Sequence, residues 1–477
     1  MAKPIPLALT YDDVLLIPRR SRIQHRADVN TATLLTDSIK LQIPFVSANM
    51  DTVTEGKLAI AMARAGGIGI IHRFMSIEDE VHEVDAVKRY EGFVIDNPFT
   101  VRPDKPLRHV LEKITTNAVS SYLVVEADGK LLGLITRRDI ILEQDQSKPV
   151  RKVMTPFSKL ITAKPGVTPA QAKKIFITHK IEKLPLIDHN GKLKGLITAR
   201  SIVNFEQNPL ATKDGKGRLR TGAAVGVVGD FLERAEALLA AGCDVIVVDA
   251  AHGQNLVTLS AIGKLRKKFP DAQIIGGNVA TAAGARDLVK AGVDALKVGI
   301  GPGGICSTRI VTGVGVPQLT AIMDCTKAVK GRKVKVIADG GTNYPGDVSK
   351  ALAAGASSIM LAGWFAGTEE SPGEIIIRNN RRYKIHRGSA SFLSQADRAA
   401  RTGSNTLLNT IVPEGVESLI EYKGSVAEII HQLLGSLRSG MSYCDAASIK
   451  ELQKNAKFVR MTSAGFRESQ THNVNEI

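Results

Sequence analysis

A cysteine lies in a glycine-rich loop that could support covalent chemistry. Residues 299–309 read GIGPGGICSTR, in which Cys306 precedes Thr308 and Arg309. A guanidinium favours the thiolate form of a neighbouring cysteine, and a hydroxyl can relay a proton during covalent catalysis. We therefore predict that Cys306 is a nucleophile. A lone cysteine more often fills an apolar core, and that is the expected role of Cys325, which lies within a predicted helix.

Other polar residues end apolar runs that have the length of buried strands. Asp249, Asn278 and Asp339 each end a separate run. An acidic group and an amide that face one site can orient a polar ring such as a carboxamide. Lys297 lies inside a further run, and a Schiff-base lysine of an aldolase-like enzyme is the alternative that it suggests.

Glycines follow two of these runs, at Gly341 and at Gly363. Glycine lets backbone amides approach an anion closely, and a following helix N-terminus adds a favourable dipole. The pattern predicts a phosphate site, and the alternative is that these glycines only form tight turns.

The elements that position these residues follow from the alternation of apolar runs with helical segments, which is the pattern of parallel βα units. The expected strands are 43–48, 67–72, 223–228, 245–249, 274–279, 295–299, 334–339 and 357–362. Ala-Gly steps at 241–242, 291–292 and 354–355 should end helices, since glycine favours the C-cap conformation. Eight parallel strands close a barrel, so the expected fold is an α/β, (β/α)8 TIM barrel with its ligands at the carboxyl ends of the strands.

A repeated segment separates the two parts of this barrel. Residues 130–140 read KLLGLITRRDI, and residues 192–202 read KLKGLITARSI. Each copy follows a polar turn, so two copies of one small module are expected. The predicted domains are a catalytic barrel with flap and C-terminal segment at 1–91 and 207–477, and a repeat pair at 92–206, divided into about 92–148 and 149–206.

The composition indicates a globular protein, with 44% hydrophobic and 23% charged residues. No signal-peptide pattern and no apolar run of about 18 residues occurs, so we expect a cytoplasmic protein without a membrane partner. The four cysteines include no CxxC pair, which disfavours disulfides or zinc. The net charge of +16 would attract polyanions, but the basic residues are dispersed and aromatic residues are 4%. We therefore expect small phosphorylated ligands rather than nucleic acid.

Several ordered motifs resemble the IMP dehydrogenase / GMP reductase family. They are LTYDDVLLIP at 9–18, ANMDTVTE at 48–55, GGIGIIHR at 66–73, GPGGICSTR at 301–309, IADGG at 337–341, AGTEESPGE at 366–374 and VPEGVE at 412–417. The repeat pair resembles tandem CBS modules (a Bateman domain), which commonly bind adenine or guanine nucleotides. The resemblance implies a purine nucleoside monophosphate substrate, regulatory purine nucleotides at the CBS pair and a homo-oligomer, either a tetramer or an octamer.

The resemblance also implies a role for each matching residue. Cys306 is expected to attack purine C2 and form a covalent adduct, while Thr308 and Glu414 handle protons at the leaving group. The implied substrate ligands are Asn49, Gly304, Asp339, Gly341, Ala362, Gly363 and His386. The implied nicotinamide cofactor ligands are Asp249, Asn278 and Arg309. The implied ligands of a monovalent cation, expected to be K⁺, are the carbonyls of Gly301, Gly303 and Cys306. The implied regulatory nucleotide ligands are Thr136, Asp139 and Thr198, and Ser201 replaces the second Asp.

The flap before VPEGVE distinguishes the two activities of the family. Dehydrogenases carry an Arg-Tyr pair there, and the Arg acts as a base for water. Here Thr402 follows Arg401, and no Tyr occurs between Tyr383 and Tyr422. Together with Asn49, which matches the reductase form of its motif, this favours GMP reductase, which uses NADPH to convert GMP to IMP and ammonia. The alternative is IMP dehydrogenase, which converts IMP, NAD and water to XMP and NADH.

Two further alternatives follow from departures at the expected phosphate site. Gly304 and Gly363 stand where dehydrogenases have serines, and His386 stands where they have a tyrosine. Each lost hydroxyl would weaken phosphate binding by about 1 kcal/mol unless backbone amides or His386 compensate. One alternative is therefore an enzyme that acts on a modified purine nucleotide. The other is a CBS-type nucleotide sensor with weakened catalysis, against which the presence of Cys306 and Glu414 argues.

Overall fold

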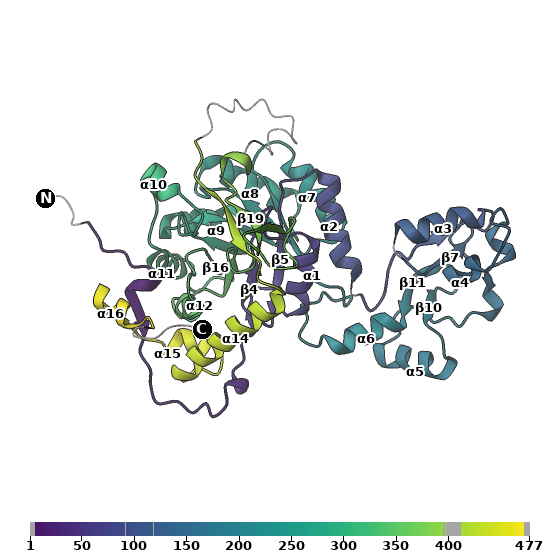
Figure 1. The fold of residues 1–477 in the computed structure, drawn as a ribbon, viewed down its shortest axis with the longest axis horizontal. Helices are drawn as coiled ribbons and strands as arrows, with labels where there is room; N and C mark the ends of the chain where they lie inside the picture. Colours follow the sequence, from purple (N-terminus) through teal and green to yellow (C-terminus); the bar gives the residue numbers. More distant parts are fainter. Residues whose placement is uncertain (1–4, 91, 118, 395, 397–411, 472–477) are drawn as a thin grey trace. The chain divides into compact units, whose positions relative to one another are not determined.

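The computed structural model describes residues 5–90, 92–117, 119–394, 396 and 412–471. The chain divides into two compact units (Figure 1). The first contains Met1–Lys88, Leu210–Thr212 and Leu219–Ile477, and the second contains Arg89–Pro209 and Lys213–Arg218. The segment expected as an insertion, 92–206, falls within the second unit.

Eight parallel strands form a closed barrel in the first unit. Around the ring they are β12 (Gly222–Val225), β13 (Val245–Asp249), β14 (Ile274–Val279), β15 (Ala295–Val298), β16 (Lys335–Asp339), β17 (Ser358–Leu361), β4 (Phe45–Ser47) and β5 (Ile68–Ile71). The ring closes where β12 pairs in parallel with β5, through Gly222 and Ala223. The predicted α/β barrel is therefore confirmed, and every strand lies within or next to a predicted run.

Helices follow the strands and surround the barrel (Figure 1). They are α1 (Gly56–Arg64), α2 (Ile77–Tyr90), α7 (Phe231–Ala240), α8 (Leu256–Lys268), α9 (Ala282–Ala291), α11 (Gln318–Ala328) and α12 (Pro345–Ala353). The predicted Ala-Gly helix ends are confirmed, since Gly242, Gly292 and Gly355 have φ angles of 94°, 105° and 113°. Glycine adopts these left-handed angles without the penalty that a Cβ would impose.

Both faces of the barrel strands are buried, because alternate residues face the interior and the surrounding helices. The interior core includes Val46, Ile70, Val247, Ile275, Ala295, Ile337 and Met360. The outward-facing core includes Phe45, Ile246, Leu296, Ala338 and Ile359. This two-sided burial explains why each strand reads as an uninterrupted apolar run. A residue two positions after an interior residue also faces inward.

Shorter elements complete the first unit. They include the antiparallel pairs β1 (Val14–Leu16) with β21 (Phe458–Arg460) and β2 (Thr33–Leu34) with β3 (Lys40–Leu41). A three-stranded antiparallel sheet contains β18 (Ile376–Arg378), β19 (Arg381–Arg387) and β20 (Glu417–Glu421). The remaining helices are η1 (Tyr11–Asp13), η2 (Arg26–Asp28), α10 (Thr308–Thr312), α14 (Val426–Tyr443), α15 (Ile449–Asn455) and α16 (Ser463–Glu468).

The second unit consists of two similar modules. The first contains β6 (Thr100–Val101), α3 (Leu107–Thr116), β7 (Ser121–Val125), β8 (Leu131–Thr136), α4 (Arg137–Ile141), η3 (Val150–Lys152), β9 (Thr155–Pro156) and η4 (Phe157–Lys159). The second contains α5 (Pro169–His179), β10 (Lys183–Ile187), β11 (Leu193–Thr198) and α6 (Ala199–Gln207). In both copies the repeated sequence forms a strand followed directly by a helix.

The two modules pair through matching turns. The Leu131 amide donates to the Gly191 carbonyl at 3.0 Å, and the Leu193 amide donates to the Gly129 carbonyl at 3.0 Å. A small core of Leu123, Val125, Leu131 and Leu196 lies between the modules. The equivalence of the contacts shows that the sequence repeat is also a structural repeat.

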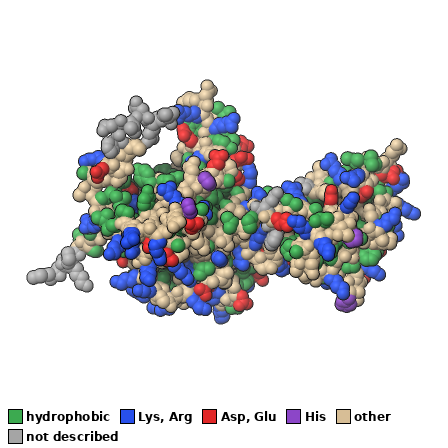
Figure 2. All heavy atoms as spheres, turned by 90° about the horizontal axis from the view of Figure 1, so that it is seen from below, with side chains coloured by type: hydrophobic (Ala, Val, Ile, Leu, Met, Phe, Trp, Pro, Cys, Tyr) green, Lys and Arg blue, Asp and Glu red, His purple; other side chains and the backbone are tan. Residues whose placement is uncertain are grey.

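No helix in the described part of the chain is long and apolar enough to cross a bilayer. On the face seen in Figure 2, Lys and Arg side chains are interspersed with acidic and hydrophobic ones on both units.

Candidate active site

The inner face of the barrel changes from apolar to charged at the carboxyl ends of the strands. On β15 Lys297 lies two residues after the interior residue Ala295, and on β16 Asp339 lies two residues after the interior residue Ile337. The strand β13 ends in the same way at Asp249. Because side chains alternate along a strand, these three charged groups share one layer at the mouth of the barrel.

Lys297 is the central cation of this layer. Its side chain is 5% exposed, and its ammonium lies 3.0 Å from Asp339 Oδ2 and 3.8 Å from Asp249 Oδ1. It also donates to Asn278 Oδ1. Burial lowers the pKa of a lysine, but the two carboxylates outweigh burial and raise the pKa of Lys297 above its ordinary value. A Schiff-base role requires a neutral amine, so this environment does not suit the aldolase-like alternative and makes Lys297 an orienting cation.

Asp249 is surrounded by cations and an amide. Arg73 Nε lies 3.5 Å from Asp249 Oδ2, and the Asn49 side chain is hydrogen-bonded to the same carboxylate. Burial alone would raise the pKa of Asp249, yet Lys297, Arg73 and Asn49 together lower it below its ordinary value. The side chain stays 17% exposed, so the carboxylate can still accept a hydrogen bond from a ligand. The structure thus brings Asn49 and Asp249, which were predicted for different ligands, into contact.

Asn278 links the ends of three strands. A register shift in β14 between Gly277 and Val279 takes Asn278 out of the ladder with β15. Its Nδ2 then donates to the Gly299 carbonyl at 2.7 Å and to Asp339 Oδ2 at 2.9 Å. Asn278, predicted as a nicotinamide ligand, and Asp339, predicted as a substrate ligand, therefore share a single hydrogen-bond network.

Gln318 also stabilises this network, through hydrogen bonds to the backbone of two neighbouring strands. The sequence did not predict this role. Gln318 is fully buried, and its Nε2 donates to the Val298 carbonyl at 2.8 Å and to the Asp339 carbonyl at 3.1 Å. The two strand ends approach so closely that a Cβ at Gly299 would lie 2.1 Å from the Asp339 carbonyl oxygen. Neither periodicity nor a motif marks a glutamine at the start of α11, so only the folded chain reveals this role.

Cys306 is exposed in the loop after β15, as expected for a nucleophile. Its Sγ lies 3.2 Å from Thr308 Oγ1 and 3.8 Å from the Glu414 carbonyl oxygen. The amide of Ser307 donates to that same carbonyl at 2.9 Å, and Cys306 forms an antiparallel bridge with Gly415. The structure thus places the three residues predicted to be catalytic in two adjacent segments.

Arg309 has a second function that the sequence did not indicate. Its Nε donates to the Ile300 carbonyl at 3.0 Å, and its Nη2 donates to the Val316 carbonyl at 2.5 Å. A Cβ at Gly301 would lie 2.5 Å from Arg309 Cγ, and one at Gly315 would lie 2.6 Å from it. Arg309 therefore ties the two ends of the cysteine loop together, and its contact with nicotinamide stays a prediction.

Two of the expected phosphate residues, Gly304 and Gly363, border open space. A Cβ at Gly304 or Gly363 would meet no atom within 4 Å. Gly341 follows β16 with a φ of 83°, and Ala362 directly follows β17. His386 is buried on β19 with its Nδ1 3.2 Å from Thr52 Oγ1. Burial and then the charge of Lys423 lower the pKa of His386 to about 4, so the ring is neutral near pH 7.

The cation ligands and regulatory residues also have defined positions. Gly303 accepts the Cys306 amide at 3.0 Å, which leaves a second lone pair on its carbonyl for a cation.

In the second unit, Asp139 Oδ2 accepts the Thr136 amide at 2.8 Å. Ser201 Oγ accepts the Thr198 amide at 3.1 Å in the equivalent place. Among the described residues, no group of three or more His, Cys, Asp or Glu side chains forms a candidate metal site.

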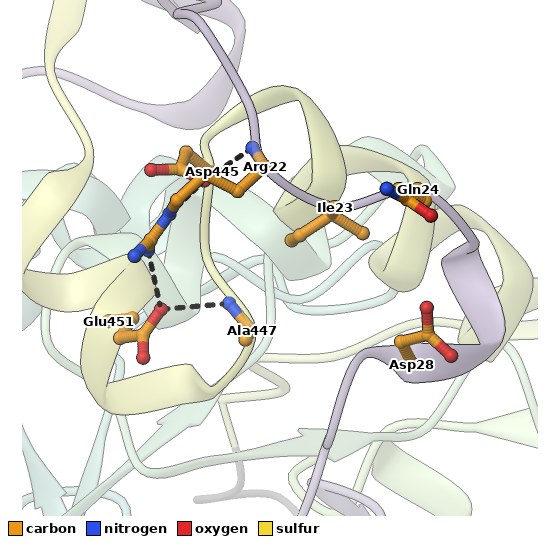
Figure 3. Close-up of a pocket in the computed structure, with 7 residues that line it drawn as sticks. All are labelled: Arg22, Ile23, Gln24, Asp28, Asp445, Ala447 and Glu451. Atoms are coloured by element: carbon orange, nitrogen blue, oxygen red, sulfur yellow. Dashed lines mark hydrogen bonds and ion pairs between the residues drawn. The ribbon is translucent and has the colours of Figure 1, made fainter.

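A hollow elsewhere in the first unit has a volume of about 380 Å³ and contains none of the predicted site residues (Figure 3). Arg22 lies 3.2 Å from Asp445 and 3.8 Å from Glu451. The glutamate also accepts the Ala447 amide at 3.0 Å. Asp28 is the fourth charged residue that lines the hollow. The flap stretch 397–403, with Arg401 and Thr402, lies outside the described residues.

Known proteins resemble this chain over nearly its whole length. A family model described as IMP dehydrogenase / GMP reductase domain matches residues 8–472. The inosine-5'-monophosphate dehydrogenase of Nitrosopumilus maritimus is 50% identical, covering 98% of each chain. A GMP reductase variant from Trypanosoma brucei in complex with guanosine 5'-monophosphate matches with a TM-score of 0.92 and 43% identity, covering 99% of each chain. The GMP reductase of the same organism with guanosine 5'-triphosphate matches with a TM-score of 0.81 and 40% identity, covering 96% of this chain and 99% of that one.

The buried charge layer predicts a large stability effect at one position. We expect Lys297→Met to lower the free energy of unfolding by about 3 to 5 kcal/mol, because Asp249 and Asp339 would be left without their shared cation. Urea unfolding followed by circular dichroism measures this change.

Lys173→Met is the matched control, since Lys173 pairs with Glu206 at 2.7 Å but 48% of its side chain is exposed. The control should lose less than about 1 kcal/mol. Equal losses from the two variants would show that Lys297 does not have the central role described above.

Proposed function

Because the chain belongs to the IMP dehydrogenase / GMP reductase family of NAD(P)-dependent purine nucleotide oxidoreductases, we propose that its principal reaction is the NADPH-dependent conversion of GMP to IMP and ammonia. The observation that carries this choice is that Thr402, which follows Arg401, replaces the Tyr of the dehydrogenase Arg-Tyr pair. Without that Tyr, the means to activate water for hydrolysis of the adduct is incomplete. Asn49, which matches the reductase form of its motif, supports the same choice.

The chain's own residues suit the first half of this reaction. The Cys306 thiolate attacks C2 of the purine and forms a C–S bond. The C2 amino group then leaves as ammonia after it receives a proton through Thr308, whose hydroxyl lies 3.2 Å from the sulfur, and Glu414. Formation of the adduct and release of ammonia therefore require no activated water.

The second half of the reaction restores the thiol. NADPH, when bound, supplies a hydride to C2, and the C–S bond breaks to release IMP. Asp249 lies at the barrel mouth and suits the nicotinamide carboxamide, because a carboxylate accepts an N–H. Asp339 suits the ribose hydroxyls for the same reason. Both Nδ2 hydrogens of Asn278 are already donated, so Asn278 can contribute only the second lone pair of its Oδ1. A K⁺ ion on the carbonyls of Gly301, Gly303 and Cys306 would hold the cysteine loop.

IMP dehydrogenase is the second candidate, and one observation favours it. The Nitrosopumilus maritimus relative, named inosine-5'-monophosphate dehydrogenase, is 50% identical to this chain. In that reaction the same cysteine would attack IMP, NAD would accept the hydride, and water would release XMP. The nucleotide-sensor alternative is disfavoured by the exposed Cys306 with its hydroxyl neighbour.

We further propose that the second unit is a tandem CBS module that binds a regulatory purine nucleotide. The matching positions of Thr136 and Thr198 support this proposal, since in both modules the threonine hydroxyl accepts the amide of the residue three positions later at the start of a helix. The Trypanosoma brucei GMP reductase solved with GTP makes GTP one ligand to test. The family also makes a homo-oligomer, either a tetramer or an octamer, the expected assembly.

The reaction itself can be tested with the purified enzyme. We expect NADPH oxidation to depend on GMP and to yield equal amounts of IMP and ammonia, measured by absorbance at about 340 nm and by chromatography. Production of XMP from IMP and NAD without turnover of GMP would reverse the choice in favour of the dehydrogenase.

The covalent mechanism predicts different effects at two cysteines. Cys306→Ala should lower kcat by at least about 10⁴-fold while the protein stays folded, because an exposed loop thiol contributes little packing. Cys325→Ala, which removes a buried thiol whose Sγ donates to the Thr281 carbonyl at 3.5 Å, should keep most of its activity. Near-normal turnover by Cys306→Ala would exclude the covalent route.

The regulatory proposal predicts unequal effects at equivalent helix caps. Asp139→Ala should raise the nucleotide concentration that gives half-maximal response by about 10-fold, because a carboxylate forms charge-assisted hydrogen bonds with ribose. Ser201→Ala removes the equivalent cap and should have a smaller effect. The measurement is enzyme activity during titration with ATP, GTP or GMP.

Deletion of 92–206 with a short linker provides the control. The deleted enzyme should keep its activity and lose the response. A response equal to that of the intact enzyme would make the repeat pair purely structural.

A further inference from the structure

A partly buried lysine with no carboxylate partner lies beside the loop that follows β17. Lys423 comes directly after the tyrosine that follows β20, and its ammonium donates to the carbonyls of Gly363 and Trp364, the latter at 3.4 Å. Both acceptors are neutral. Burial is the only cause of the change in the pKa of Lys423, which falls to about 8. Within the described part of the chain, no carboxylate therefore compensates this charge.

The nearest acidic segment is already engaged elsewhere. Glu370 accepts Ser425 Oγ at 3.0 Å and the Val426 amide at 2.9 Å, at the start of α14. Glu369 lies 3.8 Å from Lys57. Both carboxylates therefore have partners of their own, and an external anion would complete the environment of Lys423.

The loop beside Lys423 also has free donors and space. The Ala362 carbonyl accepts the amides of Phe365 and Ala366 at 3.0 and 2.8 Å, so the chain turns sharply after β17. Among the described residues, the amides of Gly363 and Trp364 donate no backbone hydrogen bond. Because a Cβ at Gly363 would meet nothing within 4 Å, an anion can approach these amides.

We propose that Lys423 binds the phosphate of the nucleoside monophosphate substrate and replaces the hydroxyl donors that Gly304 and Gly363 lack. The inference rests on the proposed function only in that the substrate is a purine nucleoside monophosphate. An ammonium has three N–H donors, so two can stay on the Gly363 and Trp364 carbonyls while the third binds a phosphate oxygen. A charge-assisted hydrogen bond is about twice as strong as a neutral one, so one cation can replace two hydroxyls.

His386 cannot supply this charge, although the sequence made it a candidate. It lies in the same region, since Lys423 contributes to the lowering of its pKa to about 4. The ring is therefore neutral when the enzyme works near pH 7. It can donate one hydrogen bond, while Lys423 supplies the positive charge.

The test compares nucleotides with nucleosides in the absence of cofactor. Dissociation constants for GMP, IMP, guanosine and inosine are measured by titration calorimetry with the full-length protein. Lys423→Met should weaken binding of the monophosphates by about 10- to 100-fold and leave nucleoside binding within about 2-fold. Lys423→Arg keeps the charge and should retain most of the affinity.

Lys384→Met is the matched control. Lys384 is a buried lysine on β19 whose ammonium donates to a carbonyl, that of Ser371 at 2.6 Å, but the charges of Glu370 and Glu369 act on it. This variant should bind GMP as the wild type does. Equal weakening of nucleotide and nucleoside binding by Lys423→Met, or no weakening of either, would overturn the proposal.

A measurement on the wild type keeps the test independent of the folding of the variants. GMP or IMP should protect Lys423 from acetylation by acetic anhydride, detected by mass spectrometry, whereas guanosine and inosine should not. Absence of protection at saturating nucleotide would overturn the assignment. A dehydrogenase would show the same protection by IMP, so an error in the direction of the reaction would leave this inference intact.

Discussion

The organisation of the site depends on the cost of burying one ammonium inside a closed barrel. Lys297 faces the interior of the barrel because it lies two residues after the interior residue Ala295 on β15. An unpaired charge at this depth would be too costly, so its stability requires carboxylates from neighbouring strands. Asp249 and Asp339 supply them, and they are correctly placed only when β13, β15 and β16 are in their native register. The charge layer therefore links the closure of the barrel to the position of the polar groups at its mouth.

The cysteine loop is built on the same layer. Asn278, which accepts from Lys297, donates to the Gly299 carbonyl where the loop begins. Arg309 then ties the beginning of the loop to its end through two carbonyls. A flexible, glycine-rich segment is thus held at both ends, which keeps the Cys306 thiol near Thr308 without burying it. Pre-organisation of this kind reduces the entropy that the reaction must overcome.

The expected phosphate site does not depend on a buried ion pair as the charge layer does. The turn after β17 offers backbone amides and space at Gly363, and its residues 362–368 carry no charged side chain. A cation comes from Lys423, far along the chain, whose ammonium donates to the carbonyls of Gly363 and Trp364. A site assembled from separate segments in this way can lose hydroxyl side chains and still recognise a phosphate, because charge can replace neutral donors.

The sequence by itself determined the barrel, since two-sided burial produces apolar runs and Ala-Gly helix ends that are local signals. It also identified the repeat and the exposed cysteine, because loop glycines and a neighbouring hydroxyl are adjacent in the chain. Only the tertiary structure decided which polar groups meet. The pairing of Lys297 with two aspartates, the support from Gln318 and the isolation of Lys423 all join residues that are distant in sequence and carry no motif. Arg309 shows the same limit, because its guanidinium lies close to the cysteine in sequence but donates to the carbonyls of Ile300 and Val316 in the folded chain.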